Sequence, residues 1–79
     1  MHFETIEWDD TNLDHATRRA SVLEIEQAIQ NADALFRHRI RDRALIRSRT
    51  DGGRRLVIVV QLNDNGRRVR PITAWEEQT

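Results

Sequence analysis

The feature that most constrains this chain is an unbroken run of five apolar residues, Leu56 to Val60, of which four are β-branched. Such a run is typical of a strand whose two faces are both at least partly covered. Turn-forming residues flank it, Asp51-Gly52-Gly53 before it and Asn63-Asp64-Asn65-Gly66 after it. Short turns of this kind join antiparallel strands. The run therefore predicts the central strand of a sheet, around which the rest of the chain is arranged.

The first half of the chain has the spacing of two short helices. Either Asp9 or Asp10 can cap a helix over residues 11–19, where apolar positions recur at intervals of three and four. Ser21 followed by Glu24 has the spacing of a capping box, which starts a second helix that stops at Asn31. Apolar residues within the segment 3–8 predict a short strand before both helices. The expected buried stripe of the first helix consists of Leu13, Ala16 and Ala20.

The second half of the chain has the period of strands. The candidate strands cover residues 35–40, 44–50, 56–62 and 69–75. Pro71 cannot donate to a ladder, so the last strand is an edge strand or carries a bulge there. We expect an α+β fold with a short N-terminal strand, two helices and a four-stranded antiparallel meander, packed as a two-layer sandwich. The chain has 79 residues, so residues 1–79 are expected to form a single domain.

Composition excludes several classes of site. Cysteine is absent, so there is no disulfide, no Cys-ligated metal and no thiol nucleophile. The three histidines have no ligand spacing, and we expect neither a metal site nor a cofactor. The chain has no apolar run long enough to span a membrane and no signal peptide pattern, so we expect a cytoplasmic protein. A chain this short buries a modest core, which favours a homo-oligomer or a hetero-complex.

The net charge of zero hides two opposed halves. Residues 1–36 carry a net charge of −6, and residues 37–70 carry +8. All 13 basic residues are arginine, whose planar guanidinium matches phosphate and carboxylate oxygens. This asymmetry favours binding to phosphate or to an acidic partner, and the alternative is neutralisation of one half by the other.

Six arginines occupy odd-numbered positions between residues 37 and 49, so they project from one face wherever this stretch is extended. They are Arg37, Arg39, Arg41, Arg43, Arg47 and Arg49. A row of guanidinium groups can bind successive phosphates of RNA, and the alternative is a solvated strand face paired with the acidic helices. The residues that we assign to nucleic-acid binding are Arg37, Arg39, Arg47 and Arg54.

Metal-independent RNA cleavage needs a base for the 2′-hydroxyl, a cation for the charge that grows on phosphorus, and an acid for the leaving oxygen. Arginine can supply the cation. His15 and His38 are the candidates for proton transfer near neutral pH, since His2 lies at the terminus. An exposed histidine with no chemical role is the alternative for both.

The order of several short motifs resembles a known family. In the first half these are Trp8-Asp9-Asp10, Asn12, His15, Arg18 and Glu24-Ile25-Glu26-Gln27-Ala28-Ile29. In the second half they are Arg43-Ala44-Leu45-Ile46, Arg49-Thr50-Asp51-Gly52-Gly53-Arg54, the run Leu56 to Val60, and Val69-Arg70-Pro71-Ile72-Thr73-Ala74-Trp75. Over residues 6–75 this order is similar to that of BrnT-type toxins and their uncharacterised relatives.

The resemblance implies a RelE-like fold, an activity that cleaves mRNA or blocks translation, and a small ribbon-helix-helix antitoxin as partner. It places Arg43, Arg49 and Arg70 on strand arginines of the family and His15 on a histidine of the related branch, which makes these four the catalytic candidates. Arg19 stands where the family has a histidine between the helices. The alternatives are a non-catalytic member of the same fold that acts through homo-oligomerisation or a regulatory partner, and an unrelated nucleic-acid-binding protein.

Overall fold

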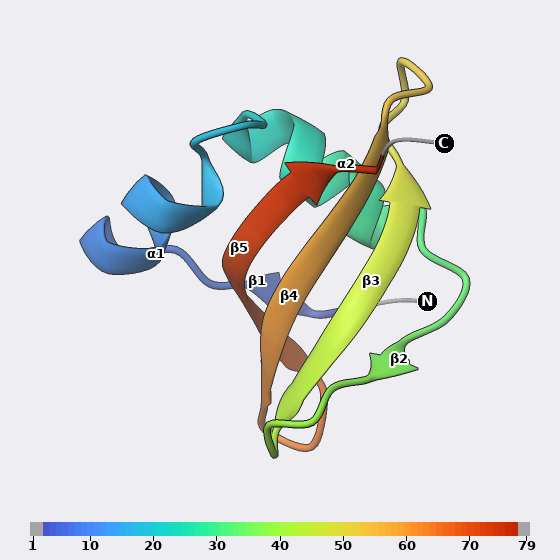
Figure 1. Ribbon diagram of the computed structural model, residues 1–79. Helices are drawn as coiled ribbons and strands as arrows, with labels where there is room; N and C mark the ends of the chain where they lie inside the picture. Colours follow the sequence, from blue (N-terminus) through green and yellow to red (C-terminus); the bar gives the residue numbers. More distant parts are fainter. Residues whose placement is uncertain (1–2, 78–79) are drawn as a thin grey trace.

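The computed structural model describes residues 3–77, and these form two helices and a five-stranded mixed sheet (Figure 1). The elements are β1 (Thr5–Ile6), α1 (Asp10–Ala16), α2 (Val22–Gln30), β2 (Phe36–Arg37), β3 (Arg43–Arg49), β4 (Arg55–Asn63) and β5 (Arg68–Glu76). The strand order is β1-β5-β4-β3-β2. One face of the sheet packs on α2, which contacts β3 and β4, while α1 contacts β5. No helix within residues 3–77 is long and apolar enough to cross a membrane.

The α+β class is confirmed, but the prediction of a four-stranded antiparallel meander is wrong. Strand β1 pairs in parallel with β5, with Thr5 opposite Arg68 and Ile6 opposite Val69, so the sheet has a fifth strand and is mixed. The backbone N–H of Glu7 extends this pairing by donating to the carbonyl of Val69 at 2.8 Å. The two helices carry the chain across one face to the far edge at β2, which leaves β1 beside the last strand. Pairing there satisfies backbone groups of both strands.

Strand β4 is the central strand that its apolar run predicts. All five residues from Leu56 to Val60 are buried. Leu56, Ile58 and Val60 belong to the core shared with the helices. Val57 and Val59 point to the opposite face, away from α2, yet only 4% and 6% of them is exposed. Neighbouring side chains on that face therefore cover β4 on its second side.

Both helices begin where their capping residues predict. Asp9 caps α1 and Ser21 caps α2, each with a reciprocal capping box. The second helix ends at Asn31 as expected. The predicted stripe of α1 is partly wrong, because Ala16 and Ala20 are buried while Leu13 is 39% exposed. Asn12 occupies the buried position instead, and α1 ends at Ala16 rather than at residue 19.

Asn12 anchors α1 to the last strand. Its side-chain amide donates to the carbonyl oxygen of Pro71 at 2.8 Å and to that of Glu7 at 3.0 Å, and its oxygen accepts from the N–H of Asp9 at 2.7 Å. Of the two alternatives expected at Pro71, an edge strand or a bulge, the structure has the bulge, since Val60 pairs with Pro71 and Val59 pairs with Thr73. Asn12 therefore holds the start of α1 against the irregular part of β5.

Replacing Asn12 with Ala should destabilise the fold by about 1–3 kcal/mol, because the buried carbonyl of Pro71 loses its donor. Urea unfolding followed by tryptophan fluorescence measures this difference. Thr11→Ala is the control, since Thr11 is the neighbouring helix residue and is exposed. Equal unfolding midpoints for Asn12→Ala and the wild type would show that Asn12 does not anchor the helix.

Candidate anion-binding pocket

Three polar side chains form a row across the sheet on the face away from α2. Arg43 on β3 lies directly opposite Gln61 on β4, and Gln61 lies directly opposite Arg70 on β5. Residues that pair directly across neighbouring strands project from the same face. The register of three strands therefore places two arginines on either side of a glutamine.

Helix α1 turns this row into a hollow. Thr11 and His15 are four residues apart on α1, so they share one helix face. Together with the row they border a hollow of about 430 Å³. Its lining residues are Thr11, Asn12, His15, Arg43, Gln61, Arg70, Ile72 and Thr73. The hollow thus combines two guanidinium groups, one imidazole and several neutral hydrogen-bonding groups.

Arg70 is fixed in this hollow by Asp9. Both carboxylate oxygens of Asp9 accept from the guanidinium, one of them at 3.1 Å from Nη2. The hydrogen bond from Arg70 is the largest cause that lowers the pKa of Asp9 from 3.8 to about 2, followed by the backbone N–H of Asn12. The same hydrogen bond raises the pKa of Arg70. Because Asp9 also caps α1, one carboxylate joins the helix start to the site and partly balances the charge of Arg70.

Arg43 differs from Arg70 in its charge balance. No carboxylate within residues 3–77 forms an ion pair with Arg43. Its positive charge is therefore the one in the hollow that an incoming anion can neutralise. His15 lines the same hollow and contributes an imidazole, which can donate or accept a hydrogen bond there. Within the described part of the chain, no cluster of three or more His, Asp or Glu side chains is arranged to hold a metal ion.

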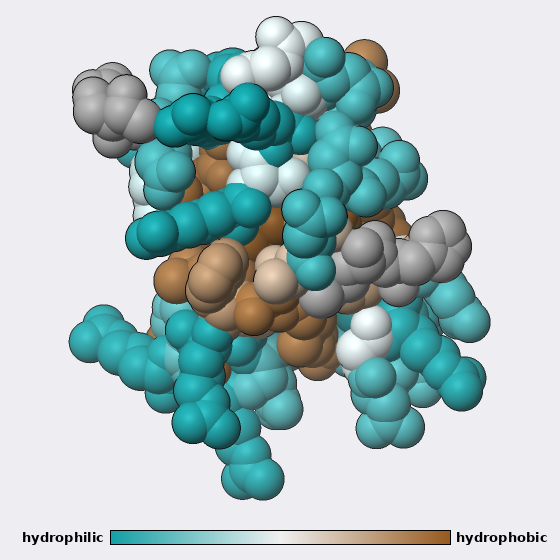
Figure 2. Space-filling model, turned by 90° about the vertical axis from the view of Figure 1, so that its right-hand side faces the viewer, coloured by the Kyte–Doolittle hydropathy of each residue, from teal (hydrophilic) through white to brown (hydrophobic). Residues whose placement is uncertain are grey.

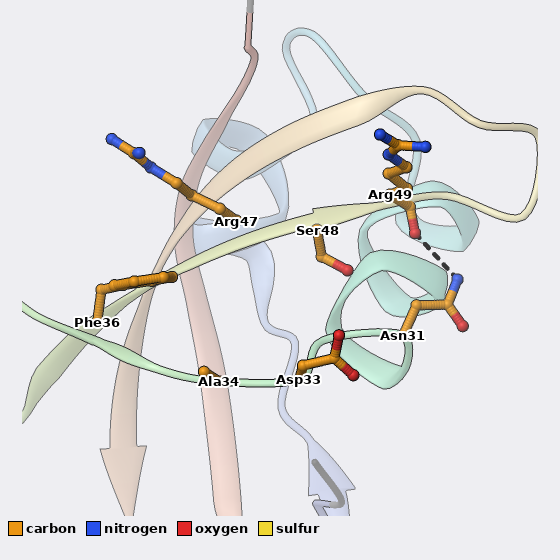
Figure 3. Close-up of a pocket in the computed structure, with 7 residues that line it drawn as sticks. All are labelled: Asn31, Asp33, Ala34, Phe36, Arg47, Ser48 and Arg49. Atoms are coloured by element: carbon orange, nitrogen blue, oxygen red, sulfur yellow. Dashed lines mark hydrogen bonds between the residues drawn. The ribbon is translucent and has the colours of Figure 1, made fainter.

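The structure brings three of the four catalytic candidates together and separates the fourth. His15, Arg43 and Arg70 line one hollow. Arg49 shares the face of Arg43 on β3 but lies six residues further along, which is about 20 Å in an extended strand. Arg49 borders a different hollow, of about 410 Å³, between β3 and the segment that leads into β2 (Figure 3).

The expected row of six arginines is only partly formed. Arg43, Arg47 and Arg49 share one face of β3, as their odd positions predict. Arg37 does not share it, because Arg37 pairs with Ala44, whose side chain lies in the helix-side core. The hairpin register pairs odd-numbered residues of β3 with even-numbered residues of β2. The odd-numbered residues of the two strands therefore lie on opposite faces of the sheet. Arg39 and Arg41 lie in the connection between the two strands.

The remaining residues assigned to nucleic-acid binding have partners of their own. Arg47 lies 3.4 Å from the Glu77 carboxylate. Arg54 forms ion pairs with Glu24 at 3.0 Å and Glu76 at 2.9 Å, and it also donates to the carbonyl oxygen of Arg19. These contacts raise the pKa of Arg54, with the hydrogen bond to Glu76 as the largest cause. Arg54 therefore joins α2 to the end of β5.

Some residues of the site escaped the sequence analysis. Thr11 could have been predicted from the sequence, since it precedes His15 by one helical turn. Gln61 and Thr73 could not have been predicted, because their place beside Arg43 and Arg70 depends on the register of three strands. Asp9 was expected to be a helix cap, and its second role as the partner of Arg70 comes from the packing of α1 on β5.

Comparison of the chain with family models, with curated proteins and with solved structures finds no match. The geometry of the hollow and the resemblance in the sequence are the two grounds on which a function can be proposed.

Asp9→Asn should lower stability at neutral pH, with an effect that disappears in acid. Asparagine caps a helix as well as aspartate does, so the variant removes mainly the charge beside Arg70. The pKa of Asp9 in the fold, about 2, is below its value in the unfolded chain, so its ionised form stabilises the fold above about pH 4. This stabilisation is lost as the pH falls towards 2.

Urea unfolding midpoints of both proteins between pH 2.5 and 7 test this prediction. The wild type should exceed Asp9→Asn by a constant amount above about pH 5, and the two curves should converge in acid. A gap that does not change with pH would mean that the ion pair with Arg70 contributes nothing.

Proposed function

We propose that this chain is a BrnT-like toxin of a type II toxin–antitoxin system, and that it cleaves RNA without a metal ion at the hollow lined by His15, Arg43 and Arg70. The observation that carries the proposal is the convergence of these three side chains from α1, β3 and β5. Guanidinium groups match phosphate oxygens, and imidazole transfers protons near neutral pH. The resemblance to BrnT-type toxins supports the same interpretation.

The proposed reaction is a transesterification of RNA. His15 removes the proton of a ribose 2′-hydroxyl while that oxygen attacks the adjacent phosphorus. Arg43 binds the non-bridging oxygens, on which negative charge grows in the transition state. The 5′-oxygen leaves and takes a proton from water, and the resulting hydroxide removes the proton that His15 gained, which yields a 2′,3′-cyclic phosphate and a 5′-hydroxyl end. Arg70, held by Asp9, borders the bound phosphate on its other side.

The proposal includes a protein partner. A small ribbon-helix-helix antitoxin, encoded in the neighbouring reading frame, is expected to neutralise the activity in the cytoplasm. Expression of the chain alone should therefore arrest bacterial growth, and expression of both proteins should relieve the arrest. If growth stays arrested when the chain is co-expressed with each short protein encoded next to it, the proposed antitoxin partner is contradicted.

Arg43→Ala and His15→Ala should each abolish growth arrest and slow RNA cleavage by about a hundredfold or more, because each removes a group that acts on the transition state. The measurement is the rate at which purified, folded protein cleaves an end-labelled RNA, together with growth after induction. Cleavage at the wild-type rate in either variant would place the active site elsewhere.

Arg41→Ala is the matched control, since it makes the same chemical change in the connection between β2 and β3, outside the hollow. It should keep the wild-type rate. Arg49→Ala should also keep most of the activity, because Arg49 lies about 20 Å along β3 from Arg43. A loss of cleavage in Arg49→Ala as large as that in Arg43→Ala would favour one continuous site along the strand.

A second candidate function is a non-catalytic binding module. The face of the sheet away from α2 carries the partly exposed side chains of Leu45 and Trp75, and Phe36, which pairs with Leu45, is 50% exposed. Exposed apolar surface of this kind favours contact with another protein surface. Light scattering over a range of concentrations, with the cleavage assay, separates the two functions. A folded wild type that dimerises at micromolar concentration, cuts no RNA and leaves growth unchanged would favour the binding module.

A further inference from the structure

The outer edge of β3 is open beyond its two pairs with β2. The N–H of Thr50 donates to the carbonyl of Arg54, so even-numbered residues of β3 bond to β4 and odd-numbered residues direct their backbone groups outward. Strand β2 pairs only with Ala44 and Leu45. Within residues 3–77, the backbone N–H and carbonyl of Arg47 and the N–H of Arg49 therefore have no strand partner.

A hollow lies along this open edge. The segment that leads from α2 into β2 bows away from β3 (Figure 1). Continued pairing would place Ala34 opposite Arg47, but the two residues instead line opposite walls of the hollow of about 410 Å³. Figure 3 shows Ser48 directed towards Asp33 inside it, while Arg47 projects away to the other side of β3. The hollow thus lies where one more strand would pair with the outer edge of β3.

The end of β3 carries positive charge that the described residues leave unbalanced. Arg49 lies directly opposite Arg55 on β4, and like charges at directly opposed positions are destabilising. Neither has an ion pair within residues 3–77, in contrast to Arg54, which has two. Arg47 has the Glu77 carboxylate 3.4 Å away, with 61% of the Arg47 side chain exposed. An acidic ligand would remove this repulsion.

Apolar surface accompanies the charge. Phe36 on β2 is 50% exposed, and it pairs with Leu45, the residue of β3 that precedes the open part of the edge. Figure 2, which views the molecule from the side where β2 and β3 lie in Figure 1, shows apolar surface between groups of hydrophilic side chains. Free backbone groups, arginines without an ion pair and the exposed ring of Phe36 therefore lie along one edge.

We propose that this edge of β3 binds an extended acidic segment of a partner polypeptide by strand addition. Backbone pairing with Arg47 and Arg49 would supply affinity, and Arg49 and Arg55 would select acidic side chains. A second copy of this chain fits less well, because antiparallel pairing of two β3 edges would bring the arginines of both copies together. Single-stranded RNA would use the arginines but not the free backbone groups. The inference does not depend on the proposed function.

The geometry also specifies the pattern of the segment. Side chains of an extended ligand alternate between the two faces of the sheet. Those on the face of Arg49 and Arg55 should be acidic. Those on the other face approach Ser48 and Asp33, where a carboxylate would be repelled, so they should be neutral and small. The expected ligand therefore alternates acidic and small neutral residues.

The probe is an eight-residue peptide of alternating Glu and Thr with an amino-terminal fluorophore, whose binding is followed by fluorescence anisotropy. Two further peptides carry N-methyl groups on all Glu or on all Thr residues, which blocks hydrogen bonding along one edge of the peptide or the other. We expect one of them to bind like the parent and the other to bind about tenfold more weakly or worse. Equal affinity of all three, equal loss in both methylated peptides, or no binding of the parent would overturn the proposal.

A double variant tests the charge. Arg49→Ala combined with Arg55→Ala should weaken binding of the parent peptide about tenfold. The matched control is Arg41→Ala combined with Arg67→Ala, which removes the same charge from two exposed positions outside the strands and should leave binding unchanged. Equal losses of peptide affinity in both double variants would show that only net charge matters, and would overturn the assignment of Arg49 and Arg55 as the residues that bind the acidic side chains.

Amide hydrogen exchange of the wild type locates the bound peptide and needs no variant. The amides of Arg47 and Arg49 should exchange at least about tenfold more slowly when the peptide is bound, because pairing protects them. Unchanged exchange at both amides would overturn strand addition. A competing ligand for this test is an eight-nucleotide single-stranded RNA. If this RNA binds more tightly, displaces the peptide and leaves both amides unprotected, the edge binds nucleic acid instead.

Discussion

Burial of β4 on both of its faces is the constraint on which the rest of the structure depends. A fully buried Val, Leu or Ile side chain contributes about 1.5–3 kcal/mol, so a chain of 79 residues gains much of its stability from this one strand. Leu56, Ile58 and Val60 require the helices on one side. Val57 and Val59 require cover on the other side, and side chains of β3 and β5 provide it, including Leu45 and Trp75. The candidate site is thus built on a face that also serves stability.

The helix side and the functional face meet at one residue. Asp9 caps α1 and holds Arg70, so the same carboxylate that starts the helix also sets the position of an arginine in the hollow. Asn12 supports this arrangement by holding α1 against the bulge at Pro71. Any change that moves α1 therefore moves His15 relative to Arg43 and Arg70, which couples the fold directly to the chemistry of the site.

Positive charge on the open face is divided between two places. Arg43 and Arg70 lie beside α1 with a histidine, while Arg49 and Arg55 lie at the other end of β3 beside an open edge. The first place combines two guanidinium groups with an imidazole. The second combines charge with free backbone groups, a combination that suits a polypeptide better than a nucleotide.

The sequence by itself determined the local elements: the central strand from its β-branched run, and the two helix starts from the Asp9-Asp10 pair and the Ser21–Glu24 spacing. At Pro71 it left two alternatives, an edge strand or a bulge. The local elements follow from interactions within a few residues, which spacing alone reveals. Only the tertiary structure decided that β1 joins β5, that Arg37 faces away from Arg43, and that Gln61 completes the site. Each depends on strand register, and register is set by which side chains pack together across the whole sheet rather than by neighbours along the chain.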